Sequence, residues 1–212
     1  MSVSLLMPIL LVIANVTGAG MIVPQVARLR RGGVTDGVSA TWVGVGISMN
    51  AWWIAYGVAA HRWGVVPVSV GGVLLYGAMA AFMLRFDGRR ALGRLSGGLA
   101  APATLVAAAL LAGGWPAAGL TIGLLYGVQF APAAYTAVRS PSVAGVSAAT
   151  WQMAWVEAVI WLVYGASAAD AALVVGGGGG VVMSSIILMR LAIAGRPRAR
   201  RRAVPLGLRT AR

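Results

Sequence analysis

The chain is 212 residues long, and 59% of its residues are hydrophobic while only 10% are charged. A soluble domain usually carries charge on about a quarter of its residues, so this composition excludes an ordinary water-soluble protein and indicates one surrounded largely by lipid. The net charge of +13 comes from arginines that lie between and after apolar segments, which argues against a nucleic-acid partner. The absence of cysteine excludes disulfides, thiolate metal sites and cysteine nucleophiles.

Seven charge-poor segments are each long enough to form a transmembrane helix, which needs about 20 mostly apolar residues. Because lipid offers the backbone no hydrogen-bond partners, we predict that these segments are helices. They are residues 1–27, 37–60, 63–84, 95–112, 114–138, 147–167 and 171–189. The sequence therefore predicts an all-α integral membrane protein with seven spans and the lipid bilayer around it.

The arginines predict the orientation of these spans. Of the 17 arginines, only Arg62 falls in an even-numbered connection, and the others fall in odd-numbered connections or the C-terminal tail. Arginine is concentrated on the cytoplasmic side of membrane proteins. We therefore expect a multi-pass plasma-membrane protein with its N-terminus outside and its C-terminus in the cytoplasm. The use of Arg without Lys is typical of a GC-rich genome and suggests a bacterial inner membrane.

The second half of the chain repeats features of the first at an offset of 108 residues. Two blocks carry the likeness, Gly-Val-Ser-Ala at 37–40 and 145–148 and Trp-x-x-Tyr-Gly at 53–57 and 161–165. Ten of the 37 residues between positions 24 and 60 are identical to their equivalents. The repeats begin four spans apart, so they share one orientation, as parallel repeats do.

The span count and the repeat together predict a 3-1-3 organisation. A first three-helix repeat covers residues 1–86, a linker segment with the fourth helix covers 87–113, and a second three-helix repeat covers 114–194. Residues 195–212 form an Arg-rich cytoplasmic tail that we predict to be disordered. One chain holds both repeats, so it can complete a transport path alone, although a homo-oligomer is also possible.

These features resemble the PQ-loop superfamily, and within it the SWEET sugar transporters and their half-size SemiSWEET relatives. The resemblance rests on Pro24-Gln25 at the end of the first span, the basic loop after it, the two Gly-Val-Ser segments and the two Trp-x-x-Tyr-Gly motifs. It covers about residues 10–190. It implies a carrier whose solute path lies on the pseudo-twofold axis between the repeats.

The resemblance also implies a binding pocket near the middle of the membrane. In SWEETs a residue late in helices 2 and 6, often Trp, lines this pocket, and Trp53 and Trp161 match those positions. The Asn that family members carry in helices 3 and 7 falls, by spacing from the Trp-x-x-Tyr-Gly motifs, on Val70 and Gly177. Two Trp walls suit a sugar ring, and the alternative is that both belong to the aromatic belt at the membrane surface.

Two polar residues inside apolar segments are further candidates for solute binding. Glu157 is the only acidic residue within a predicted span, where a charge is costly, so we expect it to face the bundle interior. It lies on the same helix face as Trp161, and its candidate roles are substrate hydrogen bonding, cation recognition, proton coupling or packing against a neighbouring glutamine. Asn50 precedes Trp53 by three residues and suits either a hydroxyl-rich ligand or an interhelical hydrogen bond.

Two prolines at equivalent positions are hinge candidates. Pro24 and Pro132 each remove a backbone hydrogen bond and favour a kink in their helix. One alternative is a hinge that lets the cytoplasmic ends of the helices swing, and the other is a static kink. Gln25 beside Pro24, and Gln129 one turn before Pro132, are grouped with them as hinge or gate residues.

The leading functional prediction is a facilitative carrier that moves a small polar solute, a sugar by resemblance, by alternating access. A second is a proton-coupled carrier of an amino acid or cationic metabolite that uses Glu157. A third, non-transport alternative is a sorting receptor or membrane adaptor. One histidine and four scattered acidic residues offer no triad, paired catalytic carboxylates or metal-ligand cluster, so we predict no enzyme, no catalytic residue, no metal and no cofactor.

Overall fold

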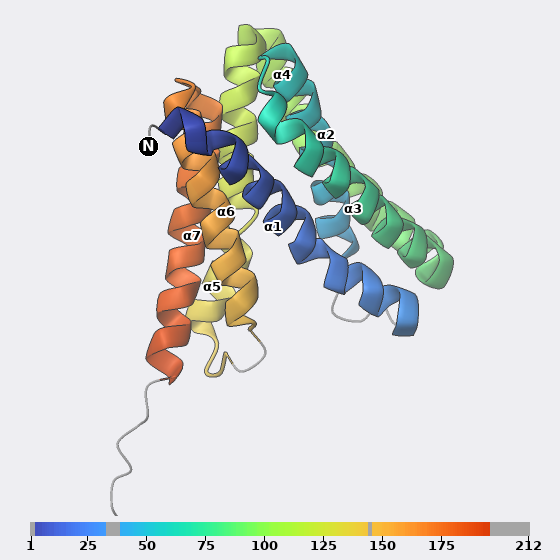
Figure 1. Ribbon diagram of the computed structural model, residues 1–212. Helices are drawn as coiled ribbons and strands as arrows, with labels where there is room; N and C mark the ends of the chain where they lie inside the picture. The colour runs from blue at the N-terminus through green and yellow to red at the C-terminus, as the bar shows by residue number, and fades with distance from the viewer. Residues whose placement is uncertain (1–2, 33–38, 144–145, 196–212) are drawn as a thin grey trace, which may run out of the picture.

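The computed structural model describes residues 3–32, 39–143 and 146–195, and every regular element in these ranges is a helix (Figure 1). The predicted all-helical fold is therefore confirmed for the described residues. The elements are α1 (Val3–Gly32), α2 (Ala40–Ala59), the 3-10 helix η1 (Trp63–Val65), α3 (Val66–Asp87), α4 (Arg89–Val128), α5 (Ala131–Arg139), α6 (Ala148–Ser167) and α7 (Ala171–Gly195). The tail predicted to be disordered lies, after Gly195, outside the described residues, as do residues 33–38 of the first connection.

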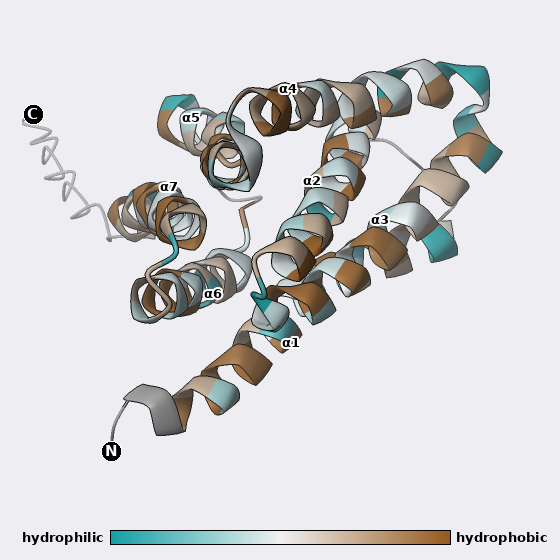
Figure 2. Cartoon of the chain, turned by 90° about the horizontal axis from the view of Figure 1, so that it is seen from above, coloured by the Kyte–Doolittle hydropathy of each residue, from teal (hydrophilic) through white to brown (hydrophobic). Residues whose placement is uncertain are grey.

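Four helical segments of the described chain are long and apolar enough to cross a membrane. They are Leu6–Arg31, Trp63–Asp87, Arg89–Arg139 and Ala171–Ala194. Hydrophobic residues run along most of the helices, and hydrophilic residues gather mainly near helix ends (Figure 2). Several long apolar helices of this kind indicate a membrane protein.

The difference between the seven predicted spans and these four segments has two physical causes. The 51-residue segment Arg89–Arg139 contains two of the predicted spans, which the apolar composition runs together. The helices α2 and α6 are each 20 residues long, which is enough to cross a bilayer. Asn50 in α2, Glu157 in α6 and the tryptophans of both helices keep the mean hydropathy of these two helices below that of the four segments.

The helix α4 consists of two helical parts joined at Gly113–Gly114. Both glycines have non-helical backbone angles, and Gly114 has a φ of 65°, a region that glycine adopts without steric cost. Before this turn α4 packs on α2, with Gly44 against Gly98. After the turn it packs on α7, with Gly127 against Gly179, because small residues let helix backbones approach closely.

The helices form two bundles. In the first, α3 lies against both α1 and α2, and in the second, α7 lies against α6, α5 and the second part of α4. The bundles meet where α1 packs on α6 and where the second part of α4 packs on the end of α2. In Figure 1 they converge at the end that carries the α2–α3 and α6–α7 connections, and they separate toward the other end.

The helices α2 and α6 begin in the same way. Ser39 Oγ accepts a hydrogen bond from the Trp42 N–H at 3.2 Å, and Ser147 Oγ accepts one from the Thr150 N–H at 3.3 Å. A serine N-cap satisfies a backbone donor that has no partner within the helix. The two Gly-Val-Ser segments therefore supply the caps that start both helices.

The two prolines predicted as hinges lie in different settings. The helix α1 runs continuously through Pro24, whereas Pro132 lies in the first turn of α5, after an interruption at Gln129–Phe130. The interruption is expected because Pro132 has no N–H to donate to the carbonyl four residues earlier. A helix interruption is thus observed at only one of the two predicted positions.

Candidate solute-binding cavity

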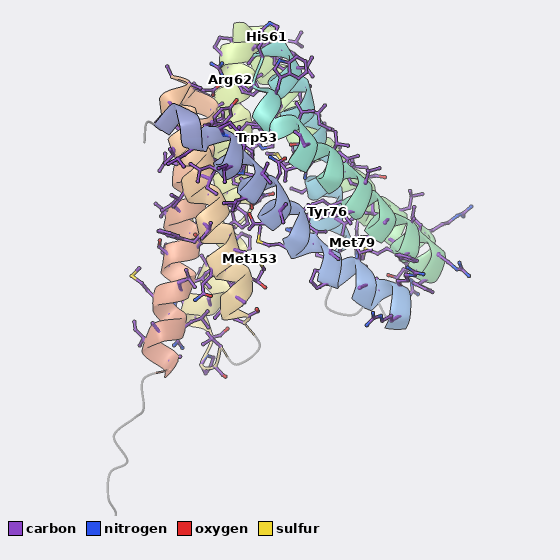
Figure 3. The ribbon with its side chains drawn as sticks, in the orientation of Figure 1. Trp53, His61, Arg62, Tyr76, Met79 and Met153 are labelled. Carbon is purple, nitrogen blue, oxygen red and sulfur yellow. The ribbon has the colours of Figure 1, made fainter. Side chains whose placement is uncertain are left out.

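A central cavity lies between the two bundles. Figure 3 shows Trp53 near the junction of the bundles, below Arg62 at their converging end. The polar and aromatic residues of its wall are Asn50, Trp53, Ser69, Tyr126, Glu157 and Trp161.

Five of the six residues predicted to bind substrate line this one cavity. They are Asn50, Trp53, Glu157, Trp161 and Gly177. The sixth, Val70, is 41% exposed and does not line the cavity, and Ser69 takes that place. The correction has a simple cause, because a step of one residue along a helix turns the side chain by about 100°.

The two tryptophans are buried between helices. Trp53 is 8% exposed and Trp161 is 6% exposed, which does not fit the alternative that they belong to a belt at the membrane surface. The rings of Trp53 and Tyr126 have centroids 6.3 Å apart and planes inclined by 84°. These two rings therefore form a corner of the cavity wall rather than a parallel stack.

Glu157 projects into the bundle interior, as the sequence predicts, and is only 5% exposed. Trp161 Nε1 donates a hydrogen bond to Glu157 Oε1 at 3.1 Å, which confirms the predicted contact between these two residues. Within the described chain, Glu157 Oε2 has no hydrogen-bond partner. Gly18 of α1 lies directly against the carboxylate, so a larger residue at that position would displace it.

Asn50 and Ser69 each direct a donor toward the backbone of their own helix. Asn50 Nδ2 donates to the Gly46 carbonyl at 2.8 Å, and Ser69 Oγ donates to the Val65 carbonyl at 2.8 Å. Asn50 Oδ1 and the lone pairs of Ser69 Oγ remain available as acceptors.

A second, larger cavity continues from the first between the separating ends of the bundles. The two cavities share Asn50, Trp53, Val68, Tyr126 and Glu157. The larger one extends to the predicted gate residue Gln129 and to the N-terminal parts of α2 and α6, toward the ends where most of the arginines lie. The other hinge or gate candidates, Pro24, Gln25 and Pro132, line neither cavity.

The converging end of the bundles is closed by a buried polar cluster. Arg62 Nε lies 2.7 Å from Asp170 Oδ2, with side-chain exposures of 29% and 2% respectively. Tyr56 OH donates to the same carboxylate at 2.9 Å, and Asp170 Oδ1 also accepts from the Leu173 N–H, which caps α7. The hydrogen bond to Asp170 raises the pKa of Arg62 above its ordinary range.

The sequence alone did not predict this cluster, because Arg62 and Asp170 lie at the ends of predicted spans, where a charged side chain is ordinarily solvated. A signal was nevertheless present in the offset of 108 residues, which places Arg62 and Asp170 at equivalent positions of the two halves.

The fold and the cavity together define the class of protein: the described part of the chain is all-helical, its apolar helices indicate a membrane protein, and a cavity lies between its two bundles. Comparison of the chain with protein-family models and with curated proteins finds no match. Its function therefore has to be argued from the cavity and from the groups that close it.

Proposed function

We propose that this chain is a seven-span membrane carrier that moves a small polar solute by alternating access. One observation carries the proposal. The cluster of Tyr56, Arg62 and Asp170 joins the bundles at their converging end, beyond the cavity (Figure 3), and the cavity continues into the larger one toward the other end. A solute site with one closed and one open end is the arrangement that alternating access requires.

The count of seven spans is supported by the course of the chain through α4 and α6. The turn at Gly113–Gly114 separates a part of α4 that packs on α2 from a part that packs on α7. With α2 and α6 of sufficient length to span, the helices can be arranged as two triples and a linker.

The ends of α2 and α6 support two parallel repeats. The Arg62 N–H donates to the Gly57 carbonyl at 2.7 Å, and the equivalent Asp170 N–H donates to the Gly165 carbonyl at 2.8 Å. The residue before each donor has a positive φ, of 55° and 49° respectively, which is uncommon outside glycine. Two loops of the same unusual geometry, 108 residues apart, favour an internal duplication.

The packing between the bundles supports a twofold relation as well. The first helix of one triple, α1, packs on the second helix of the other, α6, and the second part of α4 packs on α2 in return. This reciprocal arrangement is expected for parallel repeats related by an axis along the membrane normal.

Alternating access follows from these contacts if each triple moves as a rigid body. Release of the solute at the closed end requires the Arg62–Asp170 ion pair to separate while the opposite ends of the bundles approach. The arginines predict that the open end faces the cytoplasm, in the plasma membrane and, for a bacterium, the inner membrane. The break before Pro132 would allow α5 to bend as that end closes.

The resemblance to SWEETs makes a sugar the first substrate class to test. We would reconstitute the protein in liposomes and measure uptake of a panel of labelled sugars. Replacing Trp53 and Trp161 together by alanine should abolish uptake, whereas the matched control Trp63→Ala, at a residue 58% exposed, should leave it unchanged. Equal uptake by the double variant and the unaltered protein would remove both tryptophans from the solute site.

A further inference from the structure

The central cavity contains an acidic group that no basic residue of the described chain faces. Among the described residues, Glu157 is the only carboxylate that lines either cavity, and no Arg, Lys or His side chain lines them. Its hydrogen-bond donor, Trp161 Nε1, is neutral. Arg62, at the closed end, is already bound to Asp170 and to the Ala168 carbonyl. Burying an unpaired carboxylate is costly. A positively charged ligand therefore gains binding free energy by pairing with Glu157, and a neutral ligand does not.

The aromatic walls of the cavity favour the same kind of ligand. Trp53, Trp161 and Tyr126 all line the space beside Glu157, and the rings of Trp53 and Tyr126 meet nearly at right angles. A cation is attracted to the faces of such rings, most strongly to Trp, and aromatic cages are a common means of recognising ammonium groups.

Several hydrogen-bond donors of the cavity are already used within the protein. The single hydrogen of Ser69 Oγ and that of Trp161 Nε1 are donated to protein acceptors, and one of the two amide hydrogens of Asn50 is directed to the Gly46 carbonyl. Glu157 Oε2 and Asn50 Oδ1 accept no hydrogen bond in the described chain. A ligand with several N–H donors can supply a hydrogen to each of these two acceptors.

We propose that the solute of this cavity is a small organic ammonium ion. Its N–H groups donate to Glu157 Oε2 and Asn50 Oδ1, and its carbon skeleton lies against Trp53 and Trp161. This inference rests on the proposed carrier function, since it identifies the substrate class of the same cavity.

The test compares two probes that differ at one functional group, which is positively charged in one of them and neutral in the other. Glucamine and sorbitol have the same six-carbon chain and differ by an amino group in place of one hydroxyl. Binding to the purified full chain is measured by calorimetry at about pH 8, above the range in which carboxyl groups ordinarily titrate. Glucamine is expected to bind at least about tenfold more tightly than sorbitol, since a charge-assisted hydrogen bond and a cation–π contact are both added.

Glu157→Gln removes the charge, and its side-chain oxygen can still accept from Trp161. The preference for glucamine should fall below about threefold in this variant, because most of the preference comes from the lost charge. The matched control Asp87→Asn makes the same charge change at the end of α3, away from the cavity, and should retain the preference. If Glu157→Gln does not fold, competition on the unaltered protein decides instead: butylammonium must displace glucamine, and sorbitol at equal concentration must not.

Each outcome bears on the inference separately from the carrier function. Absence of glucamine binding, or equal affinity for glucamine and sorbitol, overturns the ammonium assignment. Uptake of glucose or sorbitol into proteoliposomes without any preference for glucamine overturns the assignment and leaves the carrier function standing. Glucamine that binds through Glu157 but never crosses the membrane upholds the assignment and removes the carrier function.

Discussion

Replacing Asp170 by alanine is expected to destabilise the junction between the bundles by about 3 kcal/mol. The substitution removes the Arg62 ion pair, the acceptor for the buried Tyr56 hydroxyl and the cap of α7. Breaking a buried pair costs about 3–5 kcal/mol, and the lower value applies here because Arg62 is 29% exposed and can rehydrate. For a chain of this size, 1 kcal/mol shifts the melting temperature by about 2–4 °C, so a decrease of about 6–12 °C is expected.

Asp170→Asn measures the contribution of the negative charge alone, because the other contacts of the side chain are kept. Asparagine caps a helix about as well as aspartate and still accepts from Tyr56, so only the attraction to Arg62 is lost. A cost of about 1–2 kcal/mol is expected, in line with a hydrogen bond to a charged group. The assay is thermal unfolding of detergent-purified protein by circular dichroism at one fixed scan rate, with Arg85→Ala, at an exposed arginine in the last turn of α3, as the control.

A double-mutant cycle decides whether the two residues act together. Arg62→Ala and Asp170→Ala combined should cost less than the sum of the single variants, with a coupling energy of about 1–3 kcal/mol. Additivity within about 0.5 kcal/mol would refute the conclusion that this ion pair holds the bundles together.

Three further predictions concern single contacts, each checked by the same melting experiment. A methyl group at Gly98 would overlap the backbone of α2, so Gly98→Ala should cost about 1–3 kcal/mol of stability. The added methyl group of Gly97→Ala meets open space, so this variant should gain up to about 1 kcal/mol from helix propensity. Equal effects of the two substitutions would contradict the described α2–α4 contact. Ser147→Ala removes the cap of α6 and should cost about 1 kcal/mol, and an unchanged melting temperature would exclude that role. Tyr56→Phe deletes only the hydroxyl group that donates a hydrogen bond to Asp170 and should cost about 1 kcal/mol of stability. A cost equal to that of Asp170→Ala would show that the ion pair contributes little.

The positions of the helices could be predicted from the sequence with good accuracy, because charge-poor segments in lipid have to be helical. The predicted segment 147–167 became α6 (Ala148–Ser167), and the predicted boundary between 112 and 114 became the turn at Gly113–Gly114. Local interactions determine these features, since serine caps and glycine turns act over a few residues. The seven-span count and the parallel repeats stay predictions, supported by the packing described above.

The candidate site was predictable only where a residue is unusual by itself. An acidic residue in an apolar span and two tryptophans in a repeated motif stand out in any sequence, and Glu157, Trp53 and Trp161 line the cavity. Ser69 and Tyr126 were missed because a serine and a tyrosine in a membrane helix are ordinary, and only packing decides where they point. Val70, which was placed by its spacing from the Trp-x-x-Tyr-Gly motif, does not line the cavity, whereas its neighbour Ser69 does.

The most direct test of alternating access is the accessibility of the shared cavity from each side of the membrane. The chain has no cysteine, so Val68→Cys, at a residue that lines both cavities, creates a single reporter of similar size. A membrane-impermeant maleimide should label it from the arginine-rich side only. Adding Asp170→Asn should raise labelling from the opposite side by about tenfold, as expected when about 1.4 kcal/mol is removed from the closed state. Equal labelling from both sides before that change, or no labelling from the opposite side after it, would contradict the account.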